Sequence, residues 1–128
     1  MYLKWFKTQE EYFYFAFRIV FGLLFAMHGL SKLGATGKPA MTGLMLVVGI
    51  GELLVGLGLV TGLFTRLAAA GGIVIMLGAW FKVHATTNWN PMTNGGELVL
   101  LFLFGFLLIL ALGYKKWGLD GLFKKEVF

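Results

Sequence analysis

Six side chains that can bind ligands or move protons lie near the ends of apolar segments. Histidines and carboxylates exchange protons, lysines bind anions, and amides donate and accept hydrogen bonds. We therefore expect a catalytic role for the residues that exchange protons and a substrate-binding role for the others. The catalytic candidates are His28, His84 and Glu97, and the substrate-binding candidates are Lys32, Lys82 and Asn94.

Each of these residues also has a structural interpretation, which the sequence leaves open. The two lysines can extend their side chains to a membrane interface. Asn94 and Glu97 suit the start of a helix, where backbone N–H groups need acceptors and the dipole favours an acid. Either histidine can simply bond a carbonyl. We expect no metal site, because the two histidines and Glu97 lack the spacing typical of metal ligands.

Two further charges, Arg18 and Glu52, lie inside apolar segments. A charge at membrane depth is costly and normally faces protein or water. With a rise of ~1.5 Å per residue, Glu52 lies roughly 17 Å and Arg18 roughly 22 Å from the connected ends of adjacent helices. The spacing predicts a buried Arg18–Glu52 ion pair. A locking role for that pair and a proton or ligand role for Glu52 both remain open.

The glycines near these charges fall on helical stripes. Gly22 and Gly29 share a face with Arg18, and Gly49 and Gly56 share a face with Glu52. Small residues let helices approach closely in lipid. The two stripes are therefore expected to face each other inside a helical bundle.

The composition indicates an integral membrane protein in contact with the lipid bilayer. Of 128 residues, 59% are hydrophobic and 13% are charged, against about a quarter charged in soluble domains. The mean hydropathy is +0.83. We interpret the net charge of +5 as basic residues flanking membrane spans, not as a nucleic-acid surface. The chain has no cysteine, so it cannot itself form disulfides, thiolate nucleophiles or iron–sulfur ligands.

The order of apolar segments predicts one all-α domain over residues 1–128, an up-down bundle of four transmembrane helices. The expected helices are approximately 12–33, 41–64, 67–84 and 97–114. Met1–Glu11 is expected to anchor the chain at the interface. Basic residues divide seven against three in favour of the side that carries both termini, which predicts cytoplasmic termini in a multi-pass protein of the cell membrane.

Three stretches carry a resemblance to a known family: RIVFGLLFAMHGLSKL (18–33), GIGELLVGLGLVTGLFTRLAA (49–69) and TNGGELVLLF (93–102). With them the chain resembles the DoxX family of small four-helix membrane proteins, which is related to the DoxD subunit of thiosulfate:quinone oxidoreductase. The resemblance implies redox chemistry at the cytoplasmic membrane, involving quinone or reduced sulfur. It points to Arg18, His28, Lys32, Glu52 and Glu97.

Three functions follow as alternatives. The first is a quinone-linked oxidoreductase subunit that binds quinone or a similar small molecule at the outer mouth of the bundle. No motif for a covalent cofactor, haem, flavin or metal is present, so electrons would come through the quinone or a redox partner subunit. The second is a carrier or exporter of a small, anionic compound, which would need to form homo-oligomers. The third is a structural subunit of a membrane complex.

Overall fold

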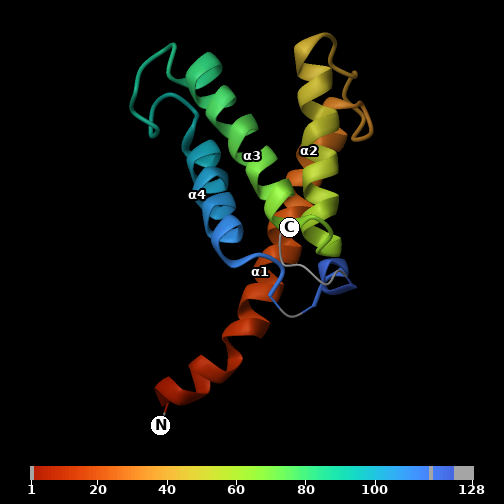
Figure 1. Ribbon diagram of the computed structural model, residues 1–128. Helices are drawn as coiled ribbons and strands as arrows, with labels where there is room; N and C mark the ends of the chain where they lie inside the picture. The colour runs from red at the N-terminus through yellow and green to blue at the C-terminus, as the bar shows by residue number, and fades with distance from the viewer. Residues whose placement is uncertain (1, 116, 123–128) are drawn as a thin grey trace.

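The computed structural model describes residues 2–115 and 117–122, and all the regular structure in this part of the chain is helical. The all-α prediction is therefore confirmed. Within the described residues, four α-helices form the bundle (Figure 1). They are α1 (Tyr2–Lys32), α2 (Leu44–Thr61), α3 (Thr65–Ala79) and α4 (Glu97–Leu112), with a π-helical turn η1 (Trp80–His84) and a 3-10 turn η2 (Leu119–Leu122).

In the described part of the chain, three helical stretches are long and apolar enough to cross a membrane: Leu3–Lys32, Leu44–Thr61 and Thr65–His84, the last of which joins α3 to η1. Helix α4 is apolar but has 16 residues, fewer than the ~20 that span the hydrocarbon core. Successive helices alternate in direction along the bundle (Figure 1). The length and apolar composition of these helices are typical of a membrane protein.

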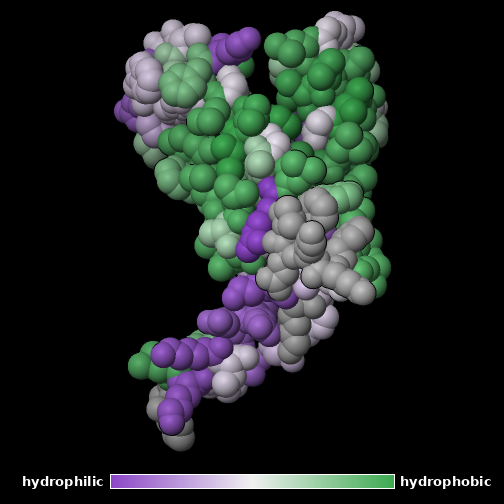
Figure 2. Space-filling view, viewed as in Figure 1, coloured by the Kyte–Doolittle hydropathy of each residue, from purple (hydrophilic) through white to green (hydrophobic). Residues whose placement is uncertain are grey.

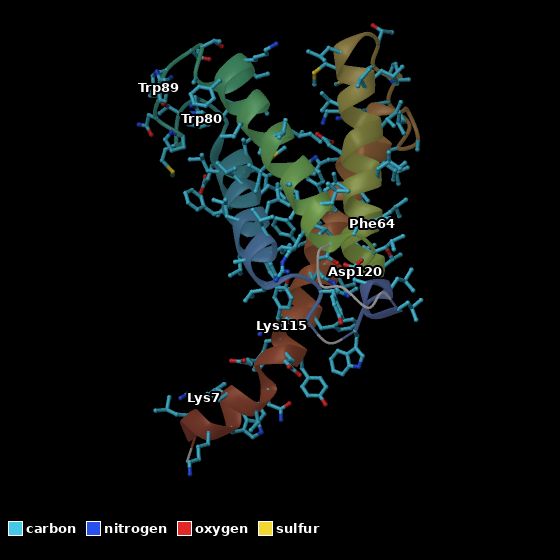
Figure 3. All side chains as sticks on the ribbon, in the orientation of Figure 1. Lys7, Phe64, Trp80, Trp89, Lys115 and Asp120 are labelled. Atoms are coloured by element: carbon cyan, nitrogen blue, oxygen red, sulfur yellow. The ribbon has the colours of Figure 1, made fainter. Side chains whose placement is uncertain are left out.

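The starts of α1 and α2 differ most from the expected bounds, whereas α3 begins two residues early, at Thr65. Helix α1 begins at Tyr2, not at residue 12, because no glycine or proline interrupts the chain before Gly22. Its N-terminal part, which carries Lys7 (Figure 3), extends beyond the other helices and is largely polar (Figures 1 and 2). Helix α2 begins at Leu44, not at residue 41, directly after Gly43 with its φ of 63°. A residue in that conformation cannot continue a right-handed helix, so α2 starts late.

The glycine stripes bring α1 and α2 into backbone contact, as expected. A Cβ atom added at Gly22 would lie 2.8 Å from the carbonyl oxygen of Gly56, and one added at Gly29 would lie 2.6 Å from that of Gly49. Only glycine permits this approach, which gives many van der Waals contacts where lipid offers no hydrophobic driving force. These contacts also fix the register in which the two helices lie.

Phenylalanine rings form the core between α1, α3 and α4. The rings of Phe25 and Phe106 are 4.8 Å apart edge to face, and those of Phe21 and Phe102 are 4.9 Å apart. Phe106 is fully buried, and its ring lies against Gly72 of α3, where a Cβ would meet it at 2.5 Å. Aromatic pairs at these distances add about 0.5–1.5 kcal/mol each beyond burial.

The two ends of the bundle differ. At one end α2 diverges from α3 and α4, and Figure 2 shows a cleft between their tips. We call it the loop end, because it carries the connections 33–43 and 85–96. At the other end the turn after α2 meets the C-terminal segment, residues 113–122 without 116, near Phe64 and Asp120 (Figure 3). We call that the closed end.

Asp120 ties the closed end together. Its carboxylate accepts hydrogen bonds from the backbone N–H groups of Phe64 (2.5 Å) and Thr65 (2.8 Å) and from the Thr65 hydroxyl (2.6 Å). Its own N–H donates to the Gly62 carbonyl at 2.8 Å. The start of α3 has no cap from its own N-cap residue, so a distant carboxylate satisfies these donors and complements the helix dipole.

Arg18 joins α1 to the same segment. Arg18 is 1% exposed, and its guanidinium donates to the carbonyl oxygens of Tyr114 (2.6 Å) and Trp117. One turn earlier on α1, the Tyr14 hydroxyl donates to the Gly113 carbonyl at 2.5 Å. The Arg18 Nε has no hydrogen-bond partner among the described residues. The C-terminal segment is thus held from α1 by side chains and from the α2–α3 turn through Asp120.

Candidate functional site

A cavity of about 420 Å³ lies at the loop end between all four helices. Its walls are mostly apolar side chains from α2, α3 and α4, such as Val48, Ile75 and Phe102. Five ionisable side chains also line it: His28, Lys32, Glu52, Lys82 and His84. Apolar walls with a few polar groups are typical of small-molecule sites. The cavity is therefore the candidate functional site.

Lys32 and Glu52 form an ion pair in the wall of this cavity. The Lys32 Nζ lies 3.0 Å from both carboxylate oxygens of Glu52. The Glu52 side chain is 5% exposed and that of Lys32 is 18% exposed. The lysine stem packs at Gly49, where an added Cβ would lie 2.7 Å from the Lys32 Cβ. The glycine contact between α1 and α2 thus places the ammonium group beside the acid.

The expected Arg18–Glu52 pair is wrong. Arg18 lies opposite Gly62: a Cβ atom added at Gly62 would be 3.1 Å from a guanidinium nitrogen of Arg18. Glu52 lies ten positions before Gly62 and pairs with Lys32. Ten helical residues correspond to about 15 Å, too far for an arginine side chain. The late start of α2 at Leu44 moves Glu52 toward the loop end and out of reach of Arg18.

The two histidines approach the cavity from different elements. His28 on α1 is exposed, and its ring lies edge to face against Phe102 of α4 at 5.7 Å. The Nδ1 of His84 lies 3.0 Å from the backbone oxygen of Asn94. A carbonyl only accepts hydrogen bonds, so Nδ1 carries the hydrogen and Nε2 of the neutral ring is the acceptor. His84 therefore offers a fixed proton-accepting nitrogen.

The other candidates divide into two groups. The exposed Lys82 belongs to η1 and lines the cavity. Asn94 and Glu97 lie outside the cavity wall among the described residues. The Asn94 side chain instead orders the 85–96 loop, because its oxygen accepts from the Gly96 N–H at 2.7 Å and its nitrogen donates to Asn88. Glu97 is exposed in the first turn of α4. Asn94 thus contributes to the site through its backbone, which positions His84.

A π-helical turn interrupts the helix beside the cavity. Residues 80–84 form η1, and the Ala85 N–H donates to the Trp80 carbonyl at 2.7 Å. Single π-helical turns are rare and often occur at functional sites. This turn carries both Lys82 and His84. The π-helical turn therefore supplies two of the five ionisable side chains of the cavity.

Two contacts went unrecognised in the sequence. Lys32 follows Gly29 by three positions and so shares its helix face. This spacing is the signal for the Lys32–Glu52 pair, but it also requires the register of α1 on α2. The role of Asp120 had a weaker signal, an acid beside Gly121 in the tail.

Among the described residues, no group of three or more histidine and acidic side chains could hold a metal ion.

Breaking the Lys32–Glu52 pair from one side should destabilise the protein. Lys32→Met leaves a nearly buried carboxylate without its partner, and we expect a loss of about 2 kcal/mol. This is below the ~3–5 kcal/mol of fully buried pairs, because the Lys32 side chain is 18% exposed. The double variant Lys32→Met/Glu52→Gln removes both charges and should recover most of that loss. Unfolding in detergent by chemical denaturant measures both. Equal losses in the single and double variants would contradict a direct pairing.

Comparison with known proteins identifies relatives of the whole bundle. The model of the DoxX family matches residues 13–85, a segment that includes α2, α3, η1 and the part of α1 that contacts them. The chain belongs to the DoxX family. The matched segment contains Lys32, Glu52, Lys82 and both histidines, whereas Asn94 and Glu97 lie beyond it. All five ionisable side chains of the cavity wall thus fall within the family's matched region.

Two relatives come from Haemophilus influenzae. One uncharacterized protein is 36% identical over 134 aligned positions, which cover 94% of this chain and 97% of the relative. Another uncharacterized protein is 33% identical over 67 positions, covering 52% of this chain and 44% of the relative. No solved structure matches the chain significantly. This DoxX protein thus shares its nearly complete length with the first relative.

Proposed function

We propose that this DoxX protein binds a quinone, or a similar small molecule with a flat polar head, in the loop-end cavity. The observation that carries the proposal is the cavity itself, in which apolar walls surround five ionisable side chains. Its apolar walls suit the ring and tail of a membrane-dissolved molecule. The lysines and histidines suit carbonyl oxygens that gain negative charge or protons.

The chain's own residues would serve the ligand in distinct ways. His84 presents Nε2 as a proton acceptor, because the Asn94 carbonyl holds its Nδ1 hydrogen. The ring of the exposed His28 packs edge to face against Phe102. Lys32, balanced by Glu52, and Lys82 would attract oxygen atoms of the head group. A bound quinone would carry electrons and protons, with a redox partner subunit supplying the electrons.

We further propose that the protein lies in the cell membrane with both termini in the cytoplasm, which puts the cavity at the outer side. The support is the uneven distribution of basic residues, seven against three. A carrier function has less support, since alternating access would require the closed end to open. Arg18 and Asp120 hold that end together with hydrogen bonds that are partly buried at Arg18 and buried at Asp120.

Loss of the His28 imidazole should weaken quinone binding. For His28→Ala we expect the dissociation constant of a short-chain neutral quinone to rise about two- to tenfold, the equivalent of one hydrogen bond. Equilibrium binding to protein in nanodiscs, corrected for partition into empty nanodiscs, measures it. Met27→Ala is the matched control, because Met27 is exposed beside His28 and lies outside the cavity wall. No saturable binding to the parent protein would refute the proposal.

A further inference from the structure

The charges in the cavity wall do not balance. Lys32 is paired with Glu52 at 3.0 Å. Lys82 lines the same cavity, and no second carboxylate lines it among the described residues. Among the lysine and acidic side chains of the wall, two ammonium groups against one carboxylate leave a single positive charge.

An unbalanced charge selects the charge of a ligand when the surroundings are apolar. The walls contributed by α2, α3 and α4 are predominantly hydrocarbon, including Met45, Val74 and Leu98. Water screens charges poorly in such surroundings, so the attraction for an opposite charge is stronger than at an open surface. One negative charge neutralises the wall, whereas a second would again leave an imbalance.

We propose that the natural ligand of this cavity is a monoanionic amphiphile. Its anionic head lies among Lys82 and the Lys32–Glu52 pair, and its apolar body lies against the hydrocarbon walls. This proposal rests on the proposed function and narrows it, because it makes an acidic, ionised molecule the preferred ligand over a neutral quinone of the same shape. Lys82 is the residue that determines the preference, since its charge is the one left without a counter-ion in the wall.

Two nearly isosteric probes separate charge from shape. A hydroxynaphthoquinone has an acidic enol that is ionised at neutral pH, and its methyl ether is the same ring without the charge. Both dissociation constants are measured with protein in nanodiscs and corrected for partition into empty nanodiscs. We expect the parent protein to bind the ionised compound about tenfold more tightly than the ether.

Three variants change the charge of the chain at chosen places. Lys82→Gln makes the wall neutral and should reduce the preference to about twofold or less, without a folding defect because Lys82 is exposed. Glu52→Gln makes the wall more positive and should increase the preference. Lys38→Gln is the matched control, since it removes a lysine charge from the 33–43 loop outside the cavity, and it should retain the parent preference.

Each result has one interpretation. Equal affinities for the two probes, or a preference that survives Lys82→Gln, would overturn the monoanion proposal while quinone binding stands. Binding of the ionised probe alone, with the ether and neutral quinones excluded, would support the monoanion and end the neutral-quinone proposal. Saturable binding of neither probe would refute both.

Discussion

A single methyl group added at Gly29 is expected to destabilise the bundle by about 3 kcal/mol or more, at the upper end of overpacking effects. The added Cβ of Gly29→Ala would lie 2.5 Å from the Leu53 nitrogen and 2.6 Å from the Gly49 oxygen. Both are backbone atoms, so no side chain can rotate away. Helices α1 and α2 would have to separate, which would weaken their other contacts. Thermal or denaturant unfolding in detergent measures the loss.

Gly78→Ala provides the matched control for this prediction. Gly78 also lies inside a helix, but an added Cβ there meets no atom within 4 Å. Replacing a helical glycine by alanine without a clash gains up to about 1 kcal/mol. The two variants should therefore change stability in opposite directions. Similar stabilities would mean that the α1–α2 contact yields easily, contrary to the backbone approach described above.

Arg18→Leu is expected to cost about 3–5 kcal/mol, because two partly buried hydrogen bonds from a charged donor, worth ~1.5–3 kcal/mol each, are lost. Their acceptors are the carbonyls of Tyr114 and Trp117. The C-terminal segment should then detach more often from α1. Limited proteolysis with trypsin reports this directly, since cleavage after the exposed Lys115 should accelerate. Unfolding in detergent measures the accompanying loss of stability.

Arg66→Leu is the control for Arg18→Leu. Arg66 also donates to backbone carbonyls, those of Leu110 (3.1 Å) and Ala111 (3.3 Å), but these hydrogen bonds are exposed. Surface substitutions of this kind usually change stability by about 0.5 kcal/mol or less. Parent-like cleavage after Lys115 in Arg18→Leu would show that Arg18 does not hold the segment.

The sequence predicted the helical bundle because its strongest signals are local. Long apolar runs gave the four helices, and the spacing of Gly22, Gly29, Gly49 and Gly56 gave the faces that α1 and α2 turn toward each other. Both signals depend on residues within a few helical turns. The structure confirms the faces, since the glycines of the two helices lie in backbone contact.

The register between helices could not be predicted in the same way. The depth of a residue in the bundle depends on where its helix starts. An error of three residues at the start of α2 shifts Glu52 by about 4.5 Å along the helix axis. That shift separates it further from Arg18 and brings Lys32 into range. Turn conformations at single residues such as Gly43 set such starts, and apolar patterning does not reveal them.

The candidate site was predicted in part. His28, Lys32, Lys82 and His84 line one cavity, and their placement follows from helix direction and loop positions alone. Glu97 was grouped with them because it begins α4, yet its side chain lies on the exposed side of that turn. The rotation of a helix about its axis decides this, and the nearly uniform apolar sequence of α4 leaves that rotation unspecified. The chemical roles of the candidate site residues stay predictions.

The tie between Arg18 and the C-terminal segment has a consequence for biosynthesis. Arg18 is synthesised early, and its acceptor, the Tyr114 carbonyl, follows 96 residues later in the chain. Until then the nascent α1 exposes a charge within a hydrophobic helix, and water, lipid head groups or insertion machinery must solvate it. The ribosome has therefore synthesised every helix of the bundle before the closed end can form, so native assembly of this small protein completes only after the last helix has been made.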